Sequence, residues 1–201
     1  VSAFGVPFGR IADIYGRRKL LILGIGIFCI SSLTASFSVN VEMLIIFRIM
    51  QGISASMIFS TNNAILIAAF PAGEMGSVLG KNLASTYFGL SIGPVLGGIL
   101  NESFGWRSIF LVTAFIAFLG FLNAIFGLPK LDEELEDAKF DKGGSGIFVG
   151  MIACILYGLT NLTISKSSYV ILGLGILLFV FFVVTEKKKV SPVVKIRMFT
   201  K

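Results

Sequence analysis

One arginine lies in an otherwise uncharged part of the chain, where a fixed positive charge could do electrostatic work. Arg48 is the only charged residue between Met43 and Phe70. Its guanidinium keeps its proton at any ordinary pH, and a charge at the centre of a lipid bilayer costs at least about 2.5 kcal/mol, so it needs a partner or a water-filled cavity. Two interpretations are open: a functional charge, or a structural arginine satisfied by neighbouring carbonyl groups.

Small and polar residues share the helix face of Arg48. Residues four apart lie on one face of a helix, and this spacing leads from Arg48 through three small residues, with Gln51 beside them and Asn63 continuing the face. The three are Gly52, Ser56 and Ser60. Such a face is expected to point into a helix bundle or a cavity rather than at lipid.

A basic segment near the beginning of the chain carries two glycines and one carboxylate. Gly9 and Gly16 permit the left-handed backbone conformations that end helices and turn tightly, so we expect a connection there. Asp13 could pair with nearby arginines or with a helix N-terminus. A basic anchor at the membrane surface would explain Arg17 and Arg18, but not the two glycines and Asp13 at this spacing.

A third motif places glycines on one face of an apolar run. Gly89, Gly93 and Gly97 are four residues apart, and Pro94 and Gly98 accompany them. The glycines allow close approach of a second helix, and the proline removes one helical hydrogen bond and can kink the helix. Taken alone, this stripe is also consistent with packing that has no special function.

The elements that carry these motifs are predicted to be membrane-spanning helices. Of the residues, 55% are apolar and 14% charged, and the mean hydropathy is +0.92. The apolar residues form continuous runs of about 20 residues or more, as helical spans require, rather than the alternating pattern of a membrane barrel. Six spans are expected at residues 20–37, 43–70, 82–100, 108–128, 143–165 and 167–185. Residues 1–8 resemble the end of a further span, so we interpret the chain as a fragment.

The basic residues predict the orientation of these spans. Cytoplasmic connections of membrane proteins are enriched in Lys and Arg, and of the 17 basic residues only Arg48, Arg107 and Lys166 fall outside one set of alternating connections. We therefore expect residues 9–19, 71–81, 129–142 and 186–201 to be cytoplasmic. The net charge of +6 is attributed to this face, and no nucleic acid partner is expected.

The expected fold is all-α, a polytopic transmembrane helix bundle in four parts. These are a transmembrane bundle at 1–128, an acidic cytoplasmic linker at 129–142, a further helix pair at 143–185 and a basic cytoplasmic tail at 186–201. The linker is interpreted as solvated, with a short surface helix or a cation site as alternatives. The chain has no histidine, and its two cysteines lie within spans, so no metal, cofactor or enzymatic activity is predicted.

In their order and spacing the motifs resemble the major facilitator superfamily, and in particular its fourteen-helix drug/proton antiporters. Residues 9–21 resemble the inner loop between the second and third helices, 44–56 the arginine motif of the fourth helix and 89–98 the antiporter motif of the fifth. Residues 105–110 resemble the start of the sixth helix. The spans at 143–185 resemble the extra helix pair of these antiporters. The sequence departs from the family pattern at Met75 and at Thr113-Ala114.

The resemblance implies a multidrug exporter that works by alternating access in the plasma membrane. In that scheme Arg48 tunes the protonation of a nearby carboxylate, Gln51 orients Arg48, and Asp13 and Arg17 hold the outward-facing state. The glycine stripe with Pro94 lets one bundle flex and seal against its neighbour. The implied partners are the lipid bilayer, protons, a small-molecule substrate and a second bundle of the same polypeptide.

One component of this mechanism is not found in the spans. The central parts of the spans contain no Asp or Glu. Glu42 and Glu102 lie at the predicted outer ends of spans. A proton-binding carboxylate is therefore expected outside this chain. The alternatives are a uniporter or symporter for a metabolite, a membrane enzyme and a purely structural membrane protein. The motif around Gly93 and Pro94 argues against the first, the missing catalytic groups against the second and the polar face of Arg48 against the third.

Overall fold

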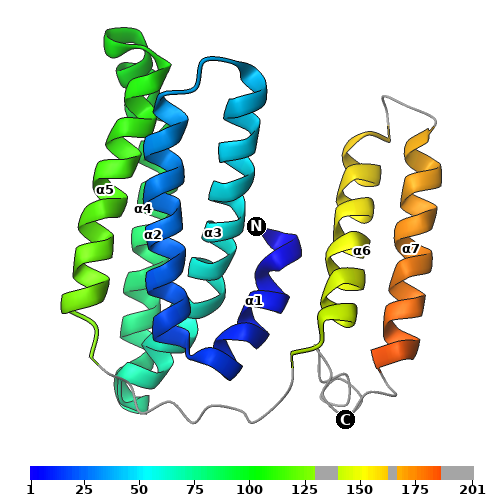
Figure 1. Ribbon diagram of the computed structural model, residues 1–201. Coiled ribbons are helices and arrows are strands. Elements are labelled where there is room, and N and C mark those ends of the chain that lie inside the picture. The colour runs from blue at the N-terminus through cyan, green and yellow to red at the C-terminus, as the bar shows by residue number, and fades with distance from the viewer. Residues whose placement is uncertain (130–139, 163–166, 187–201) are drawn as a thin grey trace. The chain divides into compact units, whose positions relative to one another are not determined.

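The computed structural model describes residues 1–129, 140–162 and 167–186, and every element in these ranges is a helix (Figure 1). The α-helices, with a short 3-10 turn at Ala72–Glu74, are α1 (Ser2–Tyr15), α2 (Arg17–Ser36), α3 (Val41–Ala69), α4 (Met75–Phe104), α5 (Trp106–Phe126), α6 (Lys142–Thr160) and α7 (Ser167–Glu186). Those from α2 to α7 are long and apolar enough to cross a membrane. This confirms the predicted all-α bundle with six spans.

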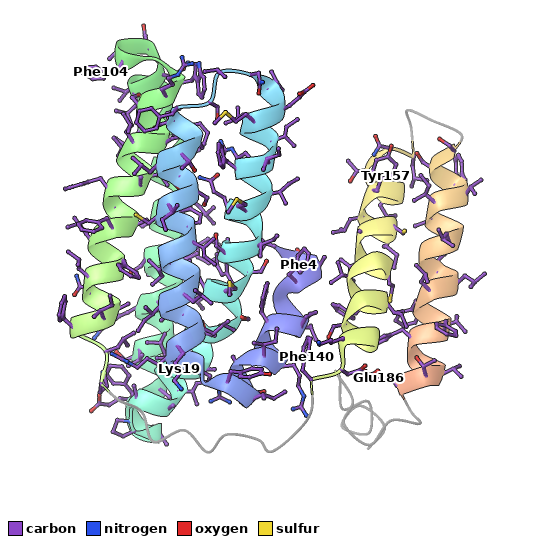
Figure 2. All side chains as sticks on the ribbon, viewed as in Figure 1. Phe4, Lys19, Phe104, Phe140, Tyr157 and Glu186 are labelled. Carbon is purple, nitrogen blue, oxygen red and sulfur yellow. The ribbon has the colours of Figure 1, made fainter. Side chains whose placement is uncertain are left out.

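The chain divides into two compact units, which are considered separately. One contains α2 to α5, and the other contains α6, α7 and α1 as far as Ile14. In the first unit successive helices run in opposite directions, and α2 packs against both α3 and α5 (Figure 1). Lys19 and Phe104 mark opposite ends of this unit (Figure 2). Such an up-and-down arrangement is what alternating inner and outer connections require.

Glycines and polar caps set the helix boundaries. Gly16 separates α1 from α2 with φ 104°, and Gly105 separates α4 from α5 with φ 79°, both in the left-handed region that favours glycine. Asn40 caps α3, because its Oδ1 accepts a hydrogen bond from Met43 N at 2.8 Å. Asp141 caps α6 through Gly144 N at 3.0 Å. Each cap satisfies a backbone donor that the helix itself leaves unpaired.

Two boundaries differ from the sequence prediction. The predicted connection beginning at Gly9 is wrong at that residue, because α1 continues through Gly9 to Tyr15 and the turn is made at Gly16. The connection expected at 71–81 is shorter, since α4 already begins at Met75. In both places the helix contains glycine, which costs only about 1 kcal/mol relative to alanine and so does not by itself end a helix. Residues 130–139 of the acidic linker and 187–201 of the basic tail lie outside the described residues.

Small residues bring α2 close to α3. A Cβ on Gly24 would lie 2.9 Å from Met57 Cβ and 3.2 Å from Ser54 O, closer than ordinary packing allows. The most buried side chains of both helices are also small, including Ser31, Ser32, Ala35, Ser54 and Thr61. Within a membrane, where lipid is as apolar as a leucine, such close contact is the main source of helix association.

The second unit contains a similar close contact. In the antiparallel pair α6 and α7, a Cβ on Gly158 would lie 3.0 Å from the Leu172 backbone, and one on Gly175 would lie 2.7 Å from an Ile155 side-chain carbon. Met151 and Phe182 form the buried core of the pair. In Figure 2, Tyr157 and Glu186 mark its opposite ends. Within the described residues, α6 and α7 are thus two packed helices, and their role as an extra transmembrane pair stays a prediction.

Candidate functional site

The site is centred on Arg48 in α3. Its Nη1 donates a hydrogen bond to Gln51 Oε1 at 3.4 Å, one turn further along the helix. Its Cζ lies 4.6 Å from the ring centroid of Phe110 in α5. Arg48 as a whole is exposed in the described chain. The guanidinium therefore has two neutral neighbours and keeps its full charge and most of its donors free for a further partner.

Gln51 connects Arg48 to α2. The Gln51 side chain is 6% exposed, and its Nε2 donates to Ser32 Oγ at 2.7 Å. Ser32 Oγ in turn donates to the Phe28 carbonyl at 2.7 Å. Both ends of the Gln51 amide are thus used, and the chain of bonds fixes its orientation. The arrangement agrees with Gln51 orienting Arg48, although that role itself stays a prediction.

The remaining predicted residues of this face differ in exposure. Ser56 is fully buried, and its Oγ donates to the Gly52 carbonyl at 2.9 Å. Ser60 is half-buried and donates to the Met57 carbonyl at 3.0 Å. Asn63 is exposed. The face therefore enters the bundle at Ser56 and leaves it at Asn63, and whether it lines a cavity stays a prediction.

Three asparagines join α3 to α4 near the other end of the face. Asn82 Oδ1 accepts from Asn62 Nδ2 at 3.1 Å, and Asn82 Nδ2 donates to Asn63 Oδ1 at 3.1 Å. Asn62 and Asn82 are not among the predicted site residues, although an amide inside an apolar run is itself a signal of interhelical bonding. Asn82 also borders an open groove of about 500 Å³ between the two helices, lined by Leu66, Phe70, Glu74, Ser77, Val78, Lys81, Asn82 and Ser85.

The basic motif is divided between the two units. Gly9 and Asp13 lie in the last turns of α1, whereas Arg17 and Arg18 begin α2. Arg18 Nη2 donates to the Ile125 carbonyl at 2.9 Å, at the end of α5. A cation at a helix C-terminus stabilises the unpaired carbonyl groups there. Arg18 therefore ties α2 to α5, a contact that the spacing of the motif alone does not reveal.

The glycine stripe lies on an open face of α4. In the part of the chain that the structure describes, a Cβ on Gly89, Gly93, Gly97 or Gly98 would meet nothing within 4 Å. Pro94 is exposed, and α4 has no buried residue. The close approach that the stripe predicts thus finds no partner among the described helices, and it remains a prediction about a helix outside them.

Comparison with known proteins defines the class. Residues 1–186 match the family described as Major Facilitator Superfamily, so the chain belongs to this superfamily of membrane transport proteins, which are not enzymes. This confirms the resemblance seen in the motifs and the expectation that the chain is no enzyme. The fourteen-helix type remains a proposal.

Particular relatives give further detail. The chain is 34% identical to the riboflavin transporter RibZ of Clostridioides difficile over 100% of its own length and 44% of the relative. It is 32% identical to multidrug resistance protein 3 of Bacillus subtilis over 97% of its length and 39% of the relative. It is 30% identical to the multidrug resistance protein Stp of Mycobacterium tuberculosis over 78% and 29%. The chain thus spans less than half the length of these relatives.

Proposed function

We propose that the complete protein carrying this chain is a secondary active transporter that exports amphipathic small molecules in exchange for protons. The observation that carries the proposal is Arg48, a charge inside an apolar helix whose contacts in the described chain, Gln51 and Phe110, are both neutral. The names of the two multidrug resistance relatives support the substrate class. Alternating access between two bundles around a midplane site would provide the transport cycle.

In this mechanism Arg48 acts through its fixed charge. A carboxylate approaching the exposed side of the guanidinium would be favoured in its ionised form, and would release its proton more readily than in an apolar site. Gln51, held by Ser32, keeps the guanidinium oriented while the carboxylate loads and unloads. We assign that carboxylate to a part of the polypeptide outside residues 1–201.

The other motifs supply the conformational change. The open stripe of Gly89, Gly93 and Gly97 would receive a helix of a second bundle, and Pro94 would let α4 flex against it. The motif of Gly9, Asp13, Gly16, Arg17 and Arg18 would form inner-face contacts that hold the outward-facing state. We place the protein in the plasma membrane with residues 9–19, 71–81, 129–142 and 186–201 in the cytoplasm, as the distribution of basic residues indicates.

A metabolite transporter is the second candidate. The relative with 34% identity over the whole chain is named a riboflavin transporter, and riboflavin is itself an amphipathic small molecule. A carrier of this kind could move its substrate as a uniporter or symporter. The two candidates differ in whether substrate movement in one direction moves protons in the other.

Proton coupling can be tested in liposomes that contain the complete protein. A pH gradient, acidic inside, is imposed, and a pH-sensitive dye in the lumen reports its decay after ethidium or riboflavin is added outside. Antiport predicts that one of the two compounds accelerates the decay, and that liposomes without protein show no acceleration. A protein that carries either compound without any effect on the gradient would contradict antiport and favour the uniporter.

A further inference from the structure

Four side chains form a stack that leads from Arg48 in α3 to the beginning of α5. The Arg48 Cζ lies 4.6 Å from the Phe110 ring centroid. The Phe110 and Trp106 rings meet edge to face at 5.9 Å and 87°. The Arg107 Cζ then lies 4.5 Å from the Trp106 ring. The two guanidinium groups are thus separated by two aromatic rings in contact.

Arg107 and Phe110 are held in place, whereas Arg48 is exposed. Arg107 Nη2 donates to the Ser38 carbonyl at 2.9 Å, in the connection between α2 and α3. Phe110 is 5% exposed and belongs to the core of the unit. Because Phe110 is buried and Arg48 is exposed, we expect Arg48 to move away from the ring more readily than Phe110 moves with Arg48.

A ring and a carboxylate hold a guanidinium with different strengths. A cation near an aromatic face at an exposed site gains about a two- to fivefold preference for the bound position, and more when desolvated, and the ring neither neutralises the charge nor exchanges a proton with it. A carboxylate forms charge-assisted and often bidentate hydrogen bonds, which are stronger. The ring can therefore hold Arg48 in place without preventing its transfer to a carboxylate.

We propose that Phe110 is a positioning residue for Arg48: it holds the guanidinium while no carboxylate is paired with it, and Trp106 with Arg107 fixes Phe110 from the outer end of α5. The inference is carried by Arg48, Phe110, Trp106 and Arg107. The transport mechanism above gives a role to Arg48 but not to the other three residues. The link to proton coupling rests on the proposed function, whereas the positioning contact itself does not.

The first test measures the contact in the complete protein, purified in detergent. Melting temperatures are compared for the wild type, Phe110→Leu, Arg48→Gln and the double variant, with Phe115→Leu as the control because Phe115 is 62% exposed on the same helix. A double-mutant cycle isolates the coupling between two residues when each single variant removes the contact, and Arg48→Gln removes the cation, whereas lysine would keep it. We expect the losses from Phe110→Leu and Arg48→Gln to be non-additive, and those from Phe115→Leu and Arg48→Gln to add. Additive losses for Phe110 and Arg48 would overturn the inference, whatever the protein transports.

The second test measures the role in transport. In liposomes, we expect Phe110→Leu to lower proton-driven export by about threefold or more, the factor that corresponds to losing one contact of this kind. Phe110→Tyr keeps the ring but adds a hydroxyl at a buried position, so we expect it to export faster than Phe110→Leu without necessarily reaching the wild-type rate, whereas Phe115→Leu should retain the wild-type rate. A wild-type rate for Phe110→Leu, or no rescue by Phe110→Tyr, would overturn the positioning role. A wild type that exports without any proton dependence would contradict the proposed function, while a non-additive melting cycle would still support the contact.

Discussion

A guanidinium held by an amide and an aromatic ring remains a full positive charge, because neither partner carries a compensating negative charge. Arg48 has this environment in the described chain. A charged guanidinium in this environment is costly in lipid. We therefore expect the stability of the protein to depend on a partner that approaches Arg48 from its exposed side. That requirement connects the local geometry of Arg48 to a transport cycle in which a carboxylate alternates between charged and neutral forms.

At the same scale, Asn82 gives a prediction about stability. Asn82→Ala removes the two hydrogen bonds that join α4 to Asn62 and Asn63 of α3. Interhelical bonds of this kind contribute about 0.6 kcal/mol each in a membrane protein, so we expect the free energy of unfolding to fall by roughly 1 kcal/mol. Unfolding of the complete protein by denaturant in mixed micelles measures it.

The matched control is Asn123→Ala, because Asn123 Nδ2 donates to the Leu119 carbonyl of its own helix, at a long 3.5 Å, and not to another helix. The control should unfold like the wild type. If Asn82→Ala does so too, the asparagine bonds do not hold α4 against α3.

The sequence predicts part of this site at the residue scale. Arg48 and Gln51 are adjacent on one helix, so their contact follows from helical spacing alone. Ser32 and Phe110 are partners from other helices, distant in sequence, and their contacts depend on how α2, α3 and α5 pack. Ser and Phe are common in membrane helices, so residue type alone does not identify Ser32 and Phe110 as partners.

At the scale of the elements, the contact between α2 and α3 depends on Gly24. In Gly24→Leu, the new Cβ at position 24 would lie 2.9 Å from Met57 Cβ, and the rest of the leucine side chain would need further space. Overpacking of this kind typically costs about 1–3 kcal/mol, and we expect a loss of that size in the free energy of unfolding. Gly120→Leu is the control, because nothing lies within 4 Å of a Cβ there, and it should not destabilise. Equal stability of the two variants would contradict the close packing of α2 on α3.

For the glycine stripe of α4 we expect a substitution to leave folding unchanged and to affect transport instead. Gly93→Leu meets no neighbour within 4 Å among the described residues, so the bundle of α2 to α5 should fold and insert normally. If a helix of a second bundle seals against this face, the added side chain would keep it away and abolish transport. Export in liposomes and the amount of inserted protein are measured together. Normal export by Gly93→Leu would show that the stripe faces lipid.

The elements themselves were largely predictable, because continuous apolar runs of the required length define spans without knowledge of packing. The boundaries were less so. Gly9 and Gly16 are the same residue type, and only Gly16 adopts the left-handed conformation. Which glycines contact a neighbouring helix was also not predictable: Gly24, Gly158 and Gly175 do so within the units, whereas the regular stripe of α4 does not. Spacing identifies a smooth face but not the helix that covers it.

At the scale of the whole molecule, the basic residues predict the orientation in the membrane. In a background where Cys29 and Cys154 are replaced by serine, Ser77→Cys should react with a membrane-impermeant thiol reagent only from the cytoplasmic side. Ser167→Cys should react only from outside. Both positions are exposed in the structure, so the reagent can reach them. Labelling of Ser167→Cys only from inside would reverse the orientation that the positive-inside rule predicts.

The central claim is that the oriented guanidinium of Arg48, and not its charge alone, couples a proton gradient to export, and uphill transport tests it most directly. In inverted membrane vesicles containing the complete protein, an imposed pH gradient, acidic inside, should drive ethidium above its equilibrium level in the wild type, and an ionophore that dissipates the gradient should release it. Arg48→Lys keeps the charge but replaces the planar guanidinium fork with a compact ammonium, and we expect it to insert normally while losing most of the uphill accumulation. Accumulation by Arg48→Lys at the wild-type level would contradict the account and make Arg48 a structural residue.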